Sequence, residues 1–165
     1  MSTISNIFEN SLIESFKGDY VFLSNFYFTY VLYDGIVWKT AEHAYQASKT
    51  LDPKEKKWIL DCPTPHLTKD LGQRLSLRED WNKVKIQIMR DIIFQKFEAN
   101  KNIKDKLIAT HPFILIEGNV WHDNFWGMCK CIKCENLKVK HNHLGIILME
   151  LRSLYINNSV FFKEN

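Results

Sequence analysis

The chain has 165 residues, a formal net charge of +3 and 45% hydrophobic residues. This length and apolar content fit one domain over residues 1–165 and exclude a mainly disordered chain, while the small charge argues against a protein that grips many phosphates. No apolar run reaches the roughly 20 residues of a membrane span. Residues 1–16 carry acids and no apolar signal core, and three of the four cysteines lie within residues 129–134, unlike a secreted disulfide framework. We therefore expect a cytoplasmic protein with no membrane partner.

The first third of the chain is expected to be rich in strands. Residues 21–30 form an aromatic and β-branched run that is typical of an extended segment. Asp34 and Gly35 then stand between β-branched residues, which predicts a short hairpin.

The rest of the chain shows helix start signals and apolar periodicity. Three starts have a side chain that can cap the first turn, namely Thr40, Asp52 before Pro53, and Thr64 before Pro65. Glu55 occupies the position of a capping-box acid. Further helices are expected from Asp80 or Trp81 onward, over residues 104–109, and over residues 144–156 with Asn142 as the cap, and a buried strand over residues 113–117. The fold class is α+β, mainly α with a small antiparallel β-sheet.

A polar stripe marks the helix that Thr40 would begin. Glu42, Tyr45, Gln46 and Lys49 fall at i, i+3, i+4 and i+7, so they share one helix face. One interpretation is a solvated face with contacts between neighbouring polar side chains. The other is the wall of a polar pocket, in which a lysine desolvated among aromatic rings would have a lowered pKa and act as a nucleophile.

The segment 117–127 interleaves indole rings with polar side chains. Such polar groups are poor core material, because each buried polar atom needs a partner. A structural loop is one interpretation. The other is a ligand site in which Trp or Phe stacks on a planar heterocycle while Asp123 and Asn124 bond its polar groups or its sugar. The polar pair Ser24-Asn25 within the aromatic run is either an edge turn or a donor pair that points into a cavity.

Three cysteines lie close together in the sequence, at Cys129, Cys131 and Cys134. A zinc knuckle would use these three thiolates and a fourth ligand. The fourth ligand would be one of three nearby histidines, His122, His141 or His143. Free buried thiols in a reducing cytosol are the alternative, because the spacing matches no paired C-x2-C motif. We expect no metal in catalysis and no required cofactor, with a structural zinc as the open alternative.

Taken together, these segments resemble the NADAR family, whose name stands for NAD and ADP-ribose associated. The matching segments, in the order found in that family, are residues 18–26, 34–49, 71–74, 80–97, 114–127 and 142–152. They span roughly residues 16–155, and the EHAYQ and DNFWG blocks are the most specific. The resemblance implies a single, mainly helical domain that hydrolyses N-glycosidic bonds. It implies one of two activities, cleavage of phosphoribosylamino-pyrimidine intermediates of riboflavin synthesis or removal of ADP-ribose from guanine.

Site roles follow from the matching positions. Lys49 is the candidate nucleophile, Glu42 the proton donor or acceptor, and Asp123 the second carboxylate, which would face the other two across a cleft. The substrate-binding candidates are Ser24, Asn25, Phe26, Gln46, Lys69, Arg74, Trp121 and Trp126. Among them, Trp126 with Phe26 or Trp121 would sandwich the base, and Lys69 and Arg74 would bind phosphate. Structural hydrogen bonds are expected for Asn119, Asn142 and Arg152.

Both substrates are glycosylamines, in which C1′ of a ribose is bonded to an exocyclic amine of a flat heterocycle. Such a group opens to an imine, which suits attack by an amine nucleophile, and water attack assisted by two carboxyl groups is the other route. We expect the partner to be ADP-ribosylated guanine in nucleic acid or in a nucleotide. A small phosphoribosylamine is the alternative substrate, and a non-catalytic module that binds ADP-ribose or a nucleotide is the alternative class of protein.

Overall fold

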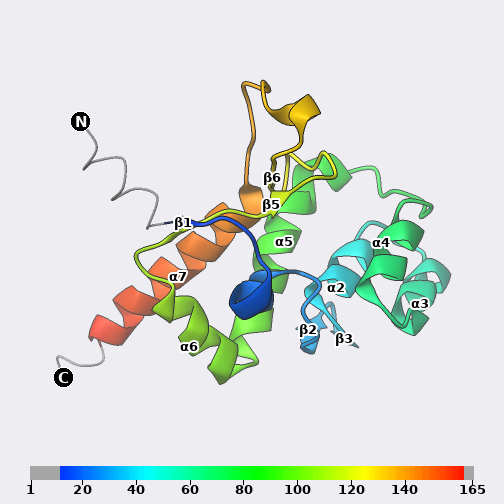
Figure 1. Cartoon of the computed structure of the whole chain (residues 1–165). Coiled ribbons are helices and arrows are strands. Elements are labelled where there is room, and N and C mark those ends of the chain that lie inside the picture. Colours follow the sequence, from blue (N-terminus) through cyan, green and yellow to red (C-terminus); the bar gives the residue numbers. More distant parts are fainter. Residues whose placement is uncertain (1–11, 162–165) are drawn as a thin grey trace. The chain divides into compact units, whose positions relative to one another are not determined.

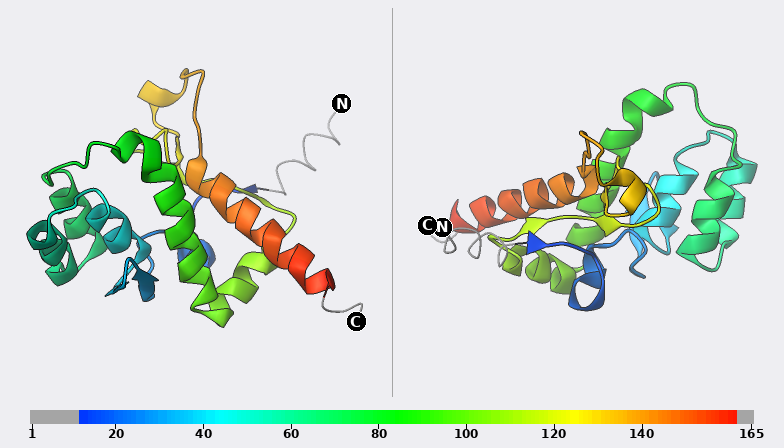
Figure 2. Two further views of the ribbon diagram at one scale, coloured as in Figure 1. Left: turned by 180° about the vertical axis from the view of Figure 1, so that it is seen from behind. Right: turned by 45° about the horizontal axis from the view of Figure 1, so that its top comes forward.

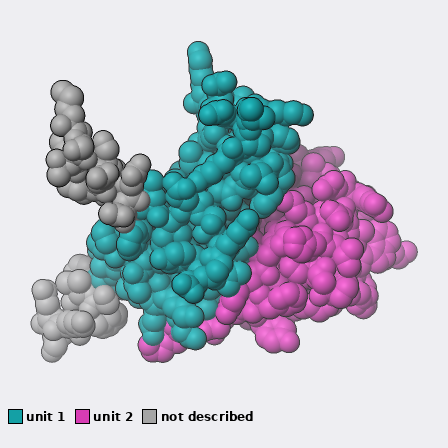
Figure 3. Space-filling view, in the orientation of Figure 1, with its two compact units in different colours: residues 1–24, 102–165 teal, residues 25–101 magenta. Residues whose placement is uncertain are grey.

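The elements of the chain are short strands and longer helices, which confirms the α+β class (Figure 1). The computed structural model describes residues 12–161, so most of the segment expected to lack an export signal lies outside the described residues. The chain divides into two compact units, unit 1 with residues 1–24 and 102–165, and unit 2 with residues 25–101 (Figure 3). The expectation of one domain over residues 1–165 stays a prediction. In the part of the chain that is described, no helix is long and apolar enough to cross a membrane.

Unit 2 contains the predicted hairpin and four helices. Strand β2 (Val31–Tyr33) pairs antiparallel with β3 (Ile36–Trp38). The turn between them has positive φ angles of 53° at Asp34 and 71° at Gly35, which this residue pair tolerates. The helices are α2 (Ala41–Ala47), α3 (Pro53–Asp61), α4 (Pro65–Gly72) and α5 (Trp81–Glu98).

The three predicted helix caps form in unit 2. Each side-chain oxygen accepts a hydrogen bond from a backbone amide of the first turn, at Thr40, Asp52 and Thr64. The capping box predicted for Glu55 is wrong. The carboxylate of Glu55 accepts hydrogen bonds from the hydroxyl of Thr50 and from the amide and hydroxyl of Ser76, so it joins the chain on either side of α3 and α4.

Helix α2 is the buried centre of unit 2. All seven of its residues are buried, and it packs against α3, α4 and α5 (Figure 1). The interpretation of its polar residues as a solvated face is therefore wrong. The helix ends at Ala47, so Lys49 lies in the following turn and not on the helix as predicted.

Unit 1 is built from helices and two parallel strand pairs. Strand β1 (Leu12–Ile13) pairs with β4 (Ile114–Leu115), and β5 (Gly118–Asn119) pairs with β6 (Met128–Cys129). Among the residues that the structure describes, the predicted antiparallel pairing is found in the hairpin of unit 2 alone. The helical elements are the 3-10 helices η1 (Gly18–Leu23) and η2 (Ile132–Cys134), and the α-helices α6 (Lys101–Ala109), which shares its first residue with unit 2, and α7 (His143–Phe161).

The extended strand predicted to begin at Val21 is wrong, because Val21, Phe22 and Leu23 form the last turn of η1.

Helix α7 packs on β4, as Figure 2 shows. The predicted structural residues bind backbone around this contact. The amide of Asn142 donates to the carbonyl of Leu115 (2.9 Å), and the guanidinium of Arg152 donates to the carbonyls of Thr110 (3.0 Å) and Phe113 (2.9 Å).

Candidate active-site residues

The buried carboxylate of Glu42 is the centre of a polar cluster on α2. Its side chain is 6% exposed, and the amide nitrogen of Gln46 donates a hydrogen bond to Oε1 at 2.7 Å. The backbone amide of Glu42 donates to the carbonyl of Asn25 at 3.0 Å. The first turn of α2 and the segment that precedes β2 thus meet at one point. A buried carboxylate that is held by a neighbour is positioned for proton transfer.

The amine of Lys49 lies near this carboxylate. Burial lowers the pKa of Lys49, the Glu42 carboxylate raises it, and the charge of Lys69 lowers it, with a net decrease. The amine stands 5.9 Å from the centre of the Tyr45 ring. The turn after α2 therefore holds an amine that loses its proton more readily than a lysine in water, as the pocket interpretation predicted.

Lys69 extends the cluster to α4. This residue lies in the last turn of α4, and its amine stands 5.9 Å from the centre of the Phe26 ring. Phe26 in turn meets the His66 ring edge-on, with ring centres 4.8 Å apart. Glu42 and Lys69 both act on the amine of Lys49, so these three groups lie near one another, with the Phe26 ring beside Lys69. Such an arrangement is suited to an anionic group attached to a flat ring.

Two buried amide oxygens in this region accept no hydrogen bond from any residue that the structure describes. They are Oδ1 of Asn25 and Oε1 of Gln46. Gln46 Oε1 occupies the space in which a side chain on Gly72 would stand, 1.9 Å from the ideal Cβ position. Buried acceptors without donors are costly, so both oxygens are suited to bind donors of a ligand.

We call Asn25, Phe26, Glu42, Gln46, Lys49 and Lys69 the α2 cluster. These predicted site residues belong to unit 2. A phosphate-binding role for Arg74 stays a prediction. Its side chain is exposed in the turn after α4, where its backbone amide donates to the carbonyl of Leu71 at 2.9 Å. The α2 cluster offers proton transfer, an amine nucleophile and anion binding.

Asp123 has a structural function in residues 117–127 of unit 1, which we call the aromatic loop. Its Oδ1 accepts hydrogen bonds from the backbone amides of Phe125 (3.0 Å) and Trp126 (2.9 Å). Asn119 fastens the other side of the loop, because its amide donates to the carbonyl of Asp123 at 2.7 Å. A substrate contact of the other oxygen, Oδ2, stays a prediction. The structural loop and the ligand site are thus compatible interpretations of the same residues.

The remaining candidates also belong to unit 1. Trp126 is half-buried, with its ring edge-on to Phe125 at 4.9 Å, whereas the side chain of Trp121 is 53% exposed. Ser24 follows η1, and its backbone amide closes that helix on the carbonyl of Val21. That Asp123 faces Glu42 across a cleft stays a prediction.

Three residues of unit 2 belong to the site although no role was predicted for them. Tyr45 lies under the amine of Lys49, and its position on the polar stripe was the available signal. His66 packs on Phe26. These residues are far apart in the sequence, so no local pattern could predict their contact. Gly72 leaves room for Gln46, and its signal was its place in one of the matching segments.

Comparisons with known proteins match this chain to one family. A sequence model of the NADAR domain matches residues 13–154. The chain is 36% identical over 153 residues to "N-glycosidase YbiA" of Shigella flexneri, which covers 90% of this chain and 91% of that protein. It is 32% identical over 108 residues to "Riboflavin biosynthesis protein VVA0006" of Vibrio vulnificus, covering 64% of this chain and 29% of that one.

A solved structure has the same fold. The NMR structure of the Escherichia coli protein YbiA matches with a TM-score of 0.75 and 33% sequence identity, over 90% of this chain and 85% of that chain. The resemblance expected from the motifs is confirmed: the chain belongs to the NADAR domain family.

Proposed function

We propose that this protein is an N-glycosidase that cleaves the bond between C1′ of a ribose phosphate unit and an exocyclic amine of a heterocycle. The observation that carries the proposal is the closeness of the buried Glu42 carboxylate to the largely buried amine of Lys49. One group can move a proton, and the other can attack carbon. The name N-glycosidase, which the YbiA relative bears, supports this activity.

The two groups divide the reaction between them. Protonated Glu42 gives its proton to the ring oxygen, the bond from C1′ to that oxygen opens, and an iminium forms between C1′ and the base nitrogen. The neutral amine of Lys49 adds to C1′. A proton moves to the base nitrogen, the C1′–base bond breaks, and a Schiff base to Lys49 remains. Water then adds to C1′ and displaces the lysine, so the net reaction consumes one water and releases a free amine and a ribose hydroxyl. No cofactor takes part.

Water attack is the alternative route at the same site. In this route one carboxyl group, Glu42 or Asp123, protonates the leaving group, and the other activates water. The lysine route is preferred because of the lowered pKa of Lys49. In the water route Lys49 would serve only as a cation.

The substrate that fits this chemistry best is ADP-ribose attached to guanine. Guanine offers N–H donors along its edge, and the buried oxygens of Asn25 and Gln46 are acceptors suited to them. Lys69 supplies charge for a phosphate, with Arg74 as an outer contact. The stacking roles predicted for Trp126, Trp121 and Phe26, and the sugar contact predicted for the Ser24 hydroxyl, stay predictions. A cytoplasmic location, where nucleotides and nucleic acids occur, is part of this proposal.

A small phosphoribosylamino-pyrimidine is the second candidate substrate. The observation in its favour is the name of the Vibrio relative, a riboflavin biosynthesis protein. Both substrates share the sugar phosphate and the glycosylamine bond, so the α2 cluster would act on either in the same way. They differ in the leaving group, and in the phosphate that the ribose carries, which is a diphosphate joined to adenosine in one and a monophosphate in the other.

Side-by-side kinetics on the two glycosylamines test the proposal. The purified chain is incubated with ADP-ribosylated guanosine nucleotide or with the phosphoribosylamino-pyrimidine, and the released base is quantified by chromatography and mass spectrometry. We expect release from both, with a higher kcat/KM on the guanine substrate, and little release by Glu42→Gln. A higher kcat/KM on the pyrimidine would reassign the substrate. Tight binding of ADP-ribosyl guanine without release would identify a binding module.

A further inference from the structure

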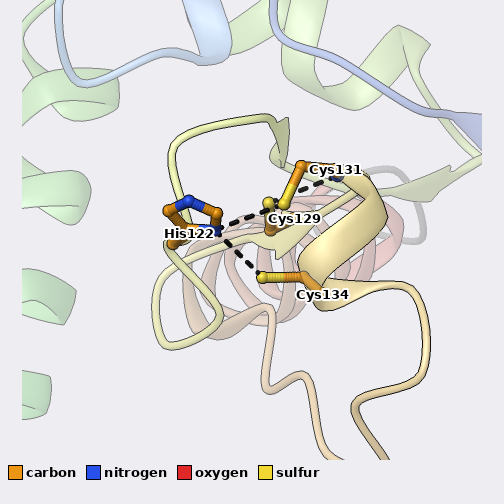
Figure 4. A group of neighbouring side chains, drawn as sticks. All are labelled: His122, Cys129, Cys131 and Cys134. Carbon is orange, nitrogen blue, oxygen red and sulfur yellow. Dashed lines mark hydrogen bonds between the residues drawn. The ribbon is translucent and has the colours of Figure 1, made fainter.

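Unit 1 gathers four potential metal ligands that the proposed reaction does not use. They are His122, Cys129, Cys131 and Cys134, and their ligand atoms all lie within 4.8 Å of one another. Figure 4 shows the imidazole of His122 facing the sulfur atoms of the three cysteines. Residues from the aromatic loop, β6, the following turn and η2 therefore converge on one point.

We propose that these four side chains bind a structural zinc ion. Three thiolates and one imidazole nitrogen are a common ligand set of closed, tetrahedral zinc sites. With Zn–S bonds of about 2.3 Å, the sulfur atoms of such a site stand about 3.8 Å apart. Nδ1 of His122 lies 3.2 Å from the sulfur of Cys131 and 3.3 Å from that of Cys134, so small side-chain shifts complete the tetrahedron.

The structure selects one histidine from the three that the sequence offered. His141 and His143 stack on each other with ring centres 5.1 Å apart and planes 4° from parallel, and neither belongs to the four-residue group. His122 instead adopts a positive φ of 68°. That backbone conformation is strained for a non-glycine residue, and such strain persists where a local contact requires it.

Neighbouring groups are arranged to stabilise bound thiolates. The amide nitrogen of Asn124 donates to the sulfur of Cys134 at 3.3 Å, and the backbone amide of Cys131 donates to the sulfur of Cys129 at 3.4 Å. Hydrogen bonds of this kind orient metal ligands and stabilise the negative charge of a thiolate. Binding releases three thiol protons and leaves a net charge of −1. The ammonium of Lys140, which donates to the carbonyl of Cys129 at 2.7 Å, partly offsets that charge.

The ion would fasten the aromatic loop to the segment after it. His122 is the neighbour of Asp123, and the cysteines follow within residues 129–134. All four ligand positions are filled by the protein, so no position is open for substrate or water. The site is therefore structural, and its presence does not depend on the proposed glycosidase activity.

Metal analysis of the full chain tests the proposal. The protein is purified under reducing conditions, loaded with Zn²⁺ and gel-filtered, and zinc is measured by mass spectrometry against protein concentration. We expect one zinc per chain. Loading with Co²⁺ should give an intense thiolate-to-cobalt charge-transfer band together with the strong visible bands of a tetrahedral site. The cobalt spectrum uses the unmutated chain, so it holds even where a variant folds poorly.

Variants locate the ion. Cys131→Ser and His122→Ala should lose most of the bound metal and weaken the charge-transfer band. The matched controls are Cys62→Ser, a half-buried free cysteine of unit 2, and His141→Ala, and both should keep one zinc per chain. Less than about a tenth of an equivalent of metal in the unmutated chain would overturn the proposal. Full metal content in Cys131→Ser together with Cys134→Ser would also overturn it.

Discussion

Lys49 experiences three effects on its protonation at once. Burial and the charge of Lys69 disfavour the ammonium form, whereas Glu42 favours it, and the net result is a lowered pKa. Glu42 therefore must exchange a proton during turnover, because a permanent ion pair would keep the amine charged. Gln46 supports this proton exchange, because its neutral amide nitrogen donates a hydrogen bond to one oxygen of Glu42 at 2.7 Å. A second cation at that place would instead hold the carboxylate in its charged form.

The pH dependence of kcat/KM should reveal this balance. The neutral amine of Lys49 is the reactive form, so the rate should rise with pH through the lowered pKa of Lys49. Lys69→Met removes a charge that lowers this pKa, so the pKa rises and the acid limb of the profile moves to higher pH. The control is Lys57→Met, an exposed lysine paired with Asp61, which should leave the limb in place. A limb that stays fixed or moves to lower pH in Lys69→Met would contradict the assignment.

Asp123 combines a structural and a proposed chemical role, and two substitutions separate them. Asp123→Asn keeps an Oδ1 acceptor for the amides of Phe125 and Trp126, so its unfolding free energy should stay within about 0.5 kcal/mol of the unmutated chain. Asp123→Ala loses both hydrogen bonds and should cost about 1–3 kcal/mol. Denaturant unfolding measures both. If the charge takes part in the reaction, kcat of Asp123→Asn falls at least about tenfold, and undiminished kcat would leave only the structural role.

Helices α2 and α4 pack closely because Gly72, at the end of α4, has no side chain. Gly72 ends α4 where Gln46 of α2 crosses it, and an added methyl would stand 1.9 Å from the amide oxygen. Glycine to alanine ordinarily stabilises a helix by up to about 1 kcal/mol. At Gly72, the close contact with Gln46 should make the same substitution destabilising.

Gly72→Ala should therefore destabilise unit 2 by about 1–3 kcal/mol, the usual cost of overpacking. It should also lower kcat, because Gln46 no longer holds Glu42. Asp70→Ala, an exposed change in the same helix, serves as the control and should leave both values close to those of the unmutated chain. A stabilised Gly72→Ala with normal kcat would refute the contact.

The sequence predicted those elements that local chemistry determines. Thr40, Asp52 and Thr64 mark helix starts because a side-chain cap acts within a single turn. The pairing of β1 with β4 was not predicted, because it joins two-residue strands about a hundred residues apart. The closeness of Glu42 and Lys49 followed from helical spacing, although Lys49 lies two residues beyond the end of the helix. The contact of His66 with Phe26 depends on tertiary packing, so the sequence carried no signal for it.

The whole molecule carries a net charge of only +3, which limits how many backbone phosphates of a nucleic acid it can bind. If it removes ADP-ribose from guanine in a strand, it should contact the modified nucleotide and few backbone phosphates. The slope of log kcat/KM against log salt on an ADP-ribosylated oligonucleotide should then be shallower than about −2. The same measurement on the modified mononucleotide is the control and should give a similar slope. A slope of about −5 or steeper on the oligonucleotide alone would instead indicate a strand-binding surface.

Reductive trapping tests the central claim, that the α2 cluster cleaves a glycosidic bond through Lys49. Borohydride is added during turnover of ADP-ribosyl guanine, and the protein is digested and analysed by mass spectrometry. The account predicts a reduced adduct of the sugar phosphate on Lys49, and neither adduct nor turnover in Lys49→Arg, because arginine stays protonated. Full activity in Lys49→Ala, with no adduct on the unmutated chain, would contradict it and leave water attack as the mechanism.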